Sequence, residues 1–240
     1  MKIVLIGTSW PFRGGLAAYN ERLAKAFMDA GHEVKIHTFS LQYPGFLFPG
    51  KTQLASWDQP SDIEIEQDVN SVNPFNWMLT GNKIKDERPD LVVVKFWLPF
   101  MGPAFGTILR RIKSNGHTKV VSILDNIIPH EKRPGDRPFT NYFVKPVDAF
   151  LSQSASVQED LSQFDTQKPR TLNPHPIFDN FGARESLAAA RKKIGVDAEG
   201  TYFLFFGFIR DYKGLDLLIE AMADPRVKAS RAKVIVAGEF

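Results

Sequence analysis

The stretch "FFGFIRDYKGLDLLIEAM", residues 205–222, joins an apolar run, a glycine, a basic pair and a helical pattern. The apolar run predicts a buried strand, Gly207 predicts a turn, and the leucines and isoleucine from 215 onward recur at helical spacing. A strand, a glycine turn and a helix in this order usually begin a nucleotide-binding unit. Residues 205–222 therefore predict part of an α/β nucleotide-binding domain.

The same alternation of strand and helix extends back to the amino terminus. Short apolar strands are predicted at 2–7, 33–39, 62–67, 90–96, 119–124 and 148–153, with helices at 15–31, 74–86, 103–114, 155–163 and 184–194. Several strands are too continuously apolar to face water on one side, which is typical of parallel sheets covered by helices. The fold class is α/β, with a doubly wound parallel sheet.

The first predicted helix also has a predicted buried face. It ends at Gly31, and its apolar residues fall on one side of a helix. These residues are Leu16, Tyr19, Leu23, Ala26 and Phe27.

A domain boundary is predicted in "TLNPHPIFDNFG", residues 171–182, because the two prolines forbid helix and favour an extended crossing. We place an N-terminal domain at 1–172 and a second domain at 173–240. The second part contains a leading helix, a strand at 201–207, a helix at 215–223 and a strand at 233–238. One βαβ unit is only a piece of a sheet, so we expect this domain to be incomplete.

Composition narrows the classes of protein. The 240 residues carry a net charge of +3 and no cysteine, which excludes a disulfide framework, a thiolate nucleophile and cysteine-ligated zinc. The basic bias is too mild and too evenly spread for a nucleic-acid binder. The amino terminus has the pattern of a strand rather than a secretory signal, and no apolar run is long enough to span a bilayer. We expect a cytoplasmic protein, with peripheral contact at the inner face of the membrane left open.

Two aromatic segments could form a surface for an acceptor or a membrane. In 40–53 the aromatic side chains either form an exposed patch or fold back onto the domain. In 95–113 aromatic and basic residues are combined, and core packing is the favoured interpretation.

A glycine-rich turn, "GTSWPFRGGLAAY" at 7–19, links the first strand to the first helix. Its glycine spacing matches neither the dinucleotide fingerprint nor the P-loop. Backbone amides at a glycine turn before a helix can nevertheless approach an anion, and Arg13 beside Gly14 and Gly15 favours a phosphate or sugar contact. An ordinary surface turn remains the alternative.

A polar loop, "SILDNIIPHEKRPGD" at 122–136, follows a strand predicted to be buried. It should therefore lie at the carboxyl edge of the sheet, where open α/β folds bind ligands. His130 could act as a general acid or base, or donate a hydrogen bond to a sugar hydroxyl, and a solvated loop is the alternative. The polar side chains gathered here are those of Asp125, Asn126, His130, Glu131, Lys132 and Arg133.

A second basic turn contains Arg210 and Lys213, flanked by Gly207 and Gly214. Two cations beside the start of a helix form a favourable site for a diphosphate. The alternative is a solvated pair of charges.

The order of these motifs resembles the retaining glycosyltransferases of family four, which have the two-Rossmann-domain architecture called GT-B. The resemblance rests on the glycine pair, "GHEV" at 31–34, the Asp125-Asn126 and His130-Glu131 pairs, Asn-Pro at 173–174, the segment at 205–222 and "VIVAGE" at 234–239. It implies transfer of a sugar from a nucleotide diphosphate sugar to an acceptor with retention of configuration and without a metal or other cofactor. It also implies that the first domain receives the acceptor and the second binds the donor.

The resemblance assigns roles to residues. Gly14 and Gly15 would face the donor phosphates, and Lys213 with Arg210 would bind the diphosphate. Many members carry arginine where this chain has Phe208, and histidine where it has Asp125. Asp125 and His130 are therefore both candidates for the catalytic contact with the donor sugar. Arg13, Asn126 and Glu131 are the acceptor-side candidates.

The resemblance also sets expectations for the whole protein. Family members continue with a pair of glutamates, seven residues apart, that bind the donor, and no such segment follows Phe240 in this sequence. We therefore expect a truncated donor domain and no turnover by these 240 residues alone. The acceptor would be a carbohydrate or glycolipid of the cell surface, with no nucleic-acid partner. The alternatives are a non-catalytic nucleotide-sugar-binding fragment and another GT-B enzyme such as a sugar epimerase.

Overall fold

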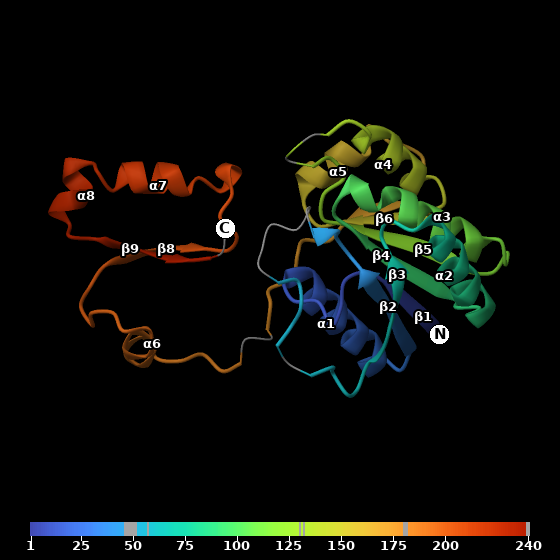
Figure 1. The fold of residues 1–240 in the computed structure, drawn as a ribbon, viewed down its shortest axis with the longest axis horizontal. Helices are drawn as coiled ribbons and strands as arrows, with labels where there is room; N and C mark the ends of the chain where they lie inside the picture. Colours follow the sequence, from blue (N-terminus) through green and yellow to red (C-terminus); the bar gives the residue numbers. More distant parts are fainter. Residues whose placement is uncertain (46–51, 57, 130, 132, 180–181, 239–240) are drawn as a thin grey trace. The chain divides into compact units, whose positions relative to one another are not determined.

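The computed structural model describes residues 1–45, 52–56, 58–129, 131, 133–179 and 182–238. Contacts divide the chain into two compact units, which we call the first and second units (Figure 1). The first unit contains the described residues of 1–45 and 53–178, and the second contains Thr52 and the described residues from 179 onward. The division falls inside the predicted crossover at 171–182, whereas the assignment of an acceptor-side and a donor-side domain stays a prediction.

The first unit is built on a seven-stranded sheet in the order β3-β2-β1-β4-β5-β6-β7, and every pairing is parallel. From β1 the chain moves outward to β3, returns to β4 beside β1, and then moves outward the other way. This confirms the doubly wound α/β fold, with its topological switch point between β1 and β4. The strands are β1 (Lys2–Ile6), β2 (Glu33–Leu41), β3 (Glu64–Asn70), β4 (Leu91–Phe96), β5 (Lys119–Leu124), β6 (Ala149–Ser152) and β7 (Arg170–Leu172).

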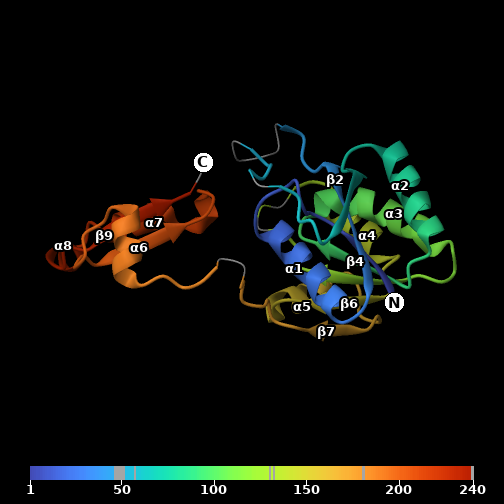
Figure 2. The same ribbon diagram turned by 90° about the horizontal axis from the view of Figure 1, so that it is seen from below.

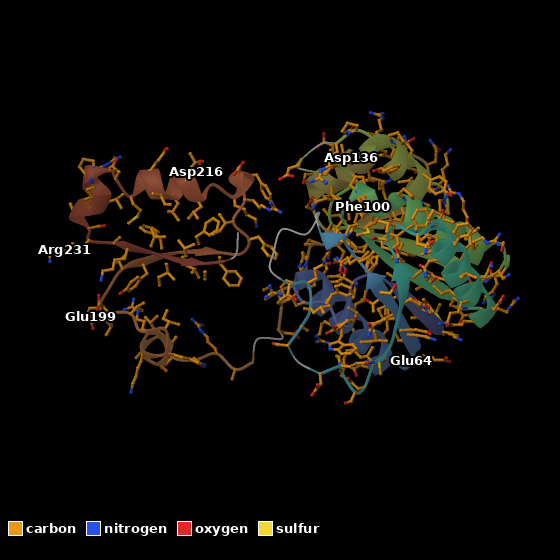
Figure 3. All side chains as sticks on the ribbon, in the orientation of Figure 1. Glu64, Phe100, Asp136, Glu199, Asp216 and Arg231 are labelled. Carbon is orange, nitrogen blue, oxygen red and sulfur yellow. The ribbon has the colours of Figure 1, made fainter. Side chains whose placement is uncertain are left out.

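Helices cover both faces of this sheet (Figure 2). Alternate residues of β1 enter two separate cores, with Val4 and Ile6 in the core beneath α2 and α3, and Ile3 and Leu5 in the core beneath α1. Side chains fill the space between sheet and helices in this unit (Figure 3). Its helices are α1 (Gly15–Asp29), α2 (Pro74–Glu87), the 3-10 turn η2 (Pro99–Met101), α3 (Gly102–Lys113), α4 (Asp136–Val144) and α5 (Ala155–Leu161).

The buried face of α1 differs from the predicted one. Tyr19, Leu23 and Phe27 pack against the core as predicted, but Ala26 is exposed. The buried positions are Ala17, Asn20 and Ala24. The face is rotated because the Asn20 side chain turns inward and donates a 2.8 Å hydrogen bond to the Thr8 carbonyl, a partner that hydrophobic periodicity does not reveal.

Helix α4 was not predicted; it begins at Asp136, where the predicted polar loop at 122–136 ends. The Arg133 amide donates to the Asp136 carboxylate at 2.6 Å just before the helix begins. Pro138 falls in the first turn, where proline costs no intrahelical hydrogen bond. The helix then buries Thr140, Phe143 and Val144, so tertiary packing stabilises a segment whose composition favours a loop.

The second unit pairs β8 (Tyr202–Phe206) with β9 (Lys233–Ala237) in parallel. Between the two strands lie the 3-10 turn η3 (Asp211–Lys213), α7 (Leu215–Ala221) and α8 (Pro225–Ala229), and α6 (Leu187–Ile194) precedes them. The predicted strand, glycine turn and helix of 205–222 are therefore present. Over the described residues of both units, no helix is long and apolar enough to cross a membrane.

Candidate functional site

The switch point between β1 and β4 is closely packed. A Cβ atom on Gly7, which follows β1, would lie 2.8 Å from the Asn20 Nδ2 atom and 3.9 Å from the Lys95 Cβ atom. Only glycine lets α1 and β4 approach this closely. The carboxyl ends of both strands meet here, so the residues that follow them share one edge of the sheet.

The glycine turn between β1 and α1 is held by Glu21 of that helix. Its Oε1 atom accepts hydrogen bonds from the Trp10 amide at 2.8 Å and from the Ser9 hydroxyl at 2.9 Å. Gly14 has a φ of 109°, a region that favours glycine, and α1 begins at the next residue. The turn is thus a fixed loop at the sheet edge, and its predicted contact with phosphates stays a prediction.

Arg13 and Gly15 lie on either side of Gly14. The Arg13 amide donates to the Gln53 carbonyl at 3.0 Å, which ties the turn to the segment after the second strand. A Cβ on Gly15 would lie 3.6 Å from the Phe178 ring, so the crossover residue packs over the beginning of α1. The acceptor-side role of Arg13 stays a prediction.

Asp125 directly follows β5 at the same edge, as the sequence predicted. Its amide donates to the Phe96 carbonyl at 2.9 Å, and its Oδ1 atom lies 2.7 Å from the Lys95 Nζ atom. The Lys95 side chain is only 2% exposed. Its ammonium also donates to the Gln153 Oε1 atom at 3.0 Å and lies 3.4 Å from the centre of the Tyr19 ring. One carboxylate, one ammonium, one amide and one phenol ring thus form a compact polar cluster.

Burial shifts the acid–base behaviour of this cluster. Burial lowers the pKa of Lys95, and the neighbouring Asp125 carboxylate opposes that shift. The pKa of Tyr19 is raised, first by burial and then by the negative charge of Asp125, so its phenol stays neutral at physiological pH.

Three members of this cluster were not predicted from the sequence as site residues. They are Lys95, Gln153 and Tyr19, the last of which was predicted only as an apolar contact. A usable signal was present for Lys95, because a lysine inside "LVVVKF" places a charge on a strand predicted to be buried on both faces. Buried charges require a partner, so Lys95 implied a carboxylate nearby. Gln153 had no such signal, since a polar residue after a strand is ordinary.

The crossover also contributes to this edge. The His175 ring lies 5.3 Å from the Tyr19 ring and 5.1 Å from the Phe178 ring, centre to centre. The rings of Tyr19, His175 and Phe178 therefore form a row of tilted contacts that begins at the Lys95 cluster. The prolines of this segment predicted only a domain crossing.

The other residues predicted for the loop after β5 are less well placed. Asn126 is half-buried, whereas Glu131 is exposed and lies 3.7 Å from the Arg133 guanidinium. His130 and Lys132 lie outside the described residues. A cavity of about 220 Å³ opens beside this loop. Neither Asn126 nor Glu131 lines it; its walls are Ile127, Ile128, Pro129, Arg133, Asp136, Arg137, Thr140, Gln163 and Phe164.

In the second unit, Arg210 directly precedes η3 and Lys213 is its last residue. Gly207 and Gly214 on either side have φ angles of 115° and 69°, which confirms a tight glycine-bounded turn. Both cationic side chains are exposed, and neither forms an ion pair within the described residues. Their predicted binding of a diphosphate stays a prediction.

A second charged cluster lies on β2, β3 and α2. Donor atoms of His37, Glu66 and Glu87 lie within 4.8 Å of one another, a spacing that could bind a metal ion. The Lys35 ammonium, however, lies 2.9 Å from the Glu66 carboxylate and 3.1 Å from the Glu87 carboxylate. A protein cation therefore already neutralises these acids, and the donor set fits an ion network better than a metal site.

His37 lies at the centre of this network and is fully buried. Its Nδ1 atom is 3.0 Å from Asp68 and its Nε2 atom 3.4 Å from Glu87. Burial opposes the charged form, but the contacts with these two carboxylates prevail and raise the pKa of His37. Burial likewise opposes ionisation of Glu87, yet His37 and Lys35 lower its pKa to about 2.

Comparisons of the sequence with known protein families and with curated proteins found no match. Among solved structures, the chain is similar to Anabaena HepE in complex with UDP and glucose, with a TM-score of 0.63 and 14% identity over 99% of this chain and 61% of that one. It is also similar to the catalytic domain of starch synthase IV from Arabidopsis thaliana bound to ADP and acarbose, with a TM-score of 0.58 and 12% identity over 99% of this chain and 68% of that one.

A third similar structure is an alpha-glucosyltransferase in complex with UDP-glucose and DNA containing an abasic site. Its TM-score is 0.56 and its identity 12%, over 100% of this chain and 57% of that one. The chain thus spans only part of the length of each neighbour. At these identities the likeness shows the fold, and the chain has the Rossmann-like α/β fold of GT-B glycosyltransferases.

Proposed function

We propose that this chain is part of a glycosyltransferase that moves a sugar from a nucleotide diphosphate sugar to an acceptor. The observation that carries the proposal is the Asp125 carboxylate, anchored by buried Lys95 beside the glycine turn at the switch point of a doubly wound sheet. Ligands of open α/β sheets bind at this point. The neighbours with the same fold are described with UDP or ADP and with sugars, which supports the same ligand class here.

Each candidate residue has a proposed role. Asp125 and His130 contact the donor sugar, and Gly14 and Gly15 face its phosphates. Arg210 and Lys213 bind the diphosphate; their exposure and their lack of ion-pair partners among the described residues support this role. Arg13, Asn126 and Glu131 contact the acceptor.

Retention of configuration and independence of metal are further parts of the proposal. Both come from the resemblance to family four. Physically, two cations at the leaving diphosphate can stabilise the charge that a metal ion would otherwise stabilise.

We propose a carbohydrate or glycolipid acceptor and a cytoplasmic site at the inner face of the membrane. Exposed apolar side chains on and just before α2, including Phe75 at 76% and Leu79 at 69% exposure, support contact with a membrane. Of the two alternatives for 40–53, Tyr43 follows the second, because it packs against the core beside Phe100, and 46–51 lie outside the described residues.

The test is release of nucleoside diphosphate by the native protein from UDP-, GDP- and ADP-sugars, with and without EDTA. The intact mass is measured first, because 27.1 kDa corresponds to these 240 residues. Release that survives EDTA, with the product keeping the anomeric configuration of the donor by NMR, is the expected result for a longer protein. A longer protein that releases no diphosphate with any donor contradicts the proposal. Nucleotide binding without release at 27.1 kDa supports the binding-fragment alternative.

Lys213→Ala tests the diphosphate site directly. Loss of a charge-assisted hydrogen bond costs about 1.5–3 kcal/mol, so the dissociation constant of the nucleoside diphosphate should rise about tenfold or more by calorimetry. Lys228→Ala is the matched control, because Lys228 is another exposed lysine of the second unit, on α8. Equal weakening by both variants would indicate a general charge effect.

Nucleic acid is the competing acceptor, since three of the similar structures, all of an alpha-glucosyltransferase, are described with DNA. The evenly spread net charge of +3 does not favour it. We expect no shift of a labelled DNA duplex in a gel at physiological salt, and a salt-dependent shift would argue for a nucleic-acid acceptor.

A further inference from the structure

We propose that Lys95 is a positioning residue for Asp125, one that fixes the carboxylate so that its outer oxygen faces the donor sugar. This inference rests on the proposed function and adds a residue to that site. It starts from one contact, the 2.7 Å approach of the Lys95 Nζ atom to the Asp125 Oδ1 atom.

The two ends of this contact differ in exposure. Lys95 is 2% exposed, whereas Asp125 keeps 19% of its side-chain surface. The Asp125 Oδ1 atom is itself buried, so the exposed part of the carboxyl group lies on its other side. The ammonium therefore holds one oxygen inside the sheet edge and leaves the other turned outward. A free aspartate at a loop would instead sample several rotamers.

The ammonium is also fixed by its own surroundings. Gln153 at the end of β6 accepts a hydrogen bond from Nζ, and the Tyr19 ring of α1 covers it at 3.4 Å. These contacts come from α1 and from the residue that follows β6. A buried charge is costly unless it is paired and hydrogen-bonded, so its presence here needs a reason beyond stability. Preorganisation of a charged group at a reaction centre is such a reason.

The chemical role follows from the charge that develops during transfer. As the bond between the anomeric carbon and the diphosphate oxygen breaks, its electron pair leaves with the diphosphate and positive charge grows on the sugar. The acceptor hydroxyl oxygen then forms the new bond, and its proton passes to the departing diphosphate. A fixed carboxylate beside the ring stabilises the positive charge without being consumed. Lys95 contributes by orientation and touches no reacting atom.

The experiment is a double-mutant cycle on the native protein with Lys95→Met, Asp125→Asn and the combined variant. Release of nucleoside diphosphate is measured as kcat and KM, and thermal unfolding is measured on the same samples. Lys168→Met is the control, because Lys168 is a half-buried lysine of the first unit whose ammonium donates to the Val144 and Lys145 carbonyls and lies 3.9 Å from the Asp165 carboxylate rather than near Asp125.

We expect Lys95→Met to lower kcat about a hundredfold with little change in KM, as a displacement of about 1 Å at a reacting centre does. In the Asp125→Asn background the same substitution should lower kcat no further, because its effect acts through the carboxylate. Lys168→Met should leave kcat unchanged. In unfolding, Asp125→Asn leaves an ammonium buried without its counter-charge, so the combined variant should be more stable than Asp125→Asn alone.

Three results would overturn the proposal. Unchanged kcat in Lys95→Met with an active wild type would remove the positioning role and leave the proposed function standing. Equal losses of kcat from Lys95→Met in the wild-type and Asp125→Asn backgrounds would show that the two residues act independently. A wild type that turns over no donor would overturn the proposed function and this role together.

Discussion

The two units are built from the same local pattern, a strand followed by a turn and a helix, and they differ in burial. In the first unit, large side chains such as Phe39, Phe96 and Phe105 are completely buried. In the second unit no described residue is buried, and Phe206 on β8 remains 78% exposed. A strand-turn-helix pattern therefore fixes local structure, whereas burial depends on how many strands and helices surround it. Two-stranded sheets are marginal by themselves for this reason.

Truncation of one phenylalanine in each unit gives the largest expected contrast. The Phe143 ring is buried and stacks on the Phe96 ring at 4.1 Å, so Phe143→Ala should cost about 3–5 kcal/mol of unfolding free energy. Phe206→Ala should cost far less, since it removes no buried contact of similar size.

Denaturant unfolding followed by tryptophan fluorescence measures this contrast. All four tryptophans, at 10, 57, 77 and 97, precede residue 179, where the main part of the second unit begins. The signal therefore follows the first unit, and circular dichroism follows both. If Phe206→Ala shifts the fluorescence midpoint as much as Phe143→Ala does, the two units do not differ in burial as proposed.

A smaller effect is expected from the charge network around His37. Its raised pKa means that the imidazolium stabilises the fold below the pKa of an unfolded histidine, and that this stability is lost as pH rises through the folded-state pKa. The pKa of Glu87, lowered to about 2, means that its contribution is lost as pH falls toward that value. The midpoint temperature of thermal unfolding should therefore decrease as pH rises through the folded-state pKa of His37. His37→Gln should make this alkaline limb of the pH profile flatter.

The control for this profile is the same substitution at His32, which is half-buried in the first unit. His32→Gln should leave the alkaline limb in place. If His37→Gln keeps the wild-type slope, the network does not contribute to stability through protonation of that imidazole.

The smallest effect is expected at the exposed ion pair of the second unit. The Lys233 ammonium lies 2.6 Å from the Asp197 carboxylate, with both side chains more than half exposed. Water and salt screen such pairs, so Asp197→Asn should leave thermal unfolding unchanged within error at low and at high salt. A salt-dependent loss of stability in this variant would show that the second unit depends on its surface charges more than its geometry indicates.

Periodicity of the sequence predicted most of the elements because their patterns are local. The strands of the first unit except β7, and the helices between them except α4, lie close to the predicted ranges, and Asp125 lies at the predicted sheet edge. Helix α4 was missed because its stability comes from burying Phe143 and Val144 rather than from its own composition. Ala26 was misplaced because a hydrogen bond of Asn20 sets the rotation of α1.

By itself, the sequence determined the α/β class, the parallel arrangement and the position of the polar loops, since each follows from residue spacing along one segment. Only the tertiary structure decided which side chains meet. Lys95, Asp125, Tyr19 and Gln153 come from four separate segments, and strand order alone brings them to one edge. The switch point between β1 and β4 depends on strand order, which joins segments far apart in the sequence. The same strand order brings Asp125 to the buried ammonium of Lys95.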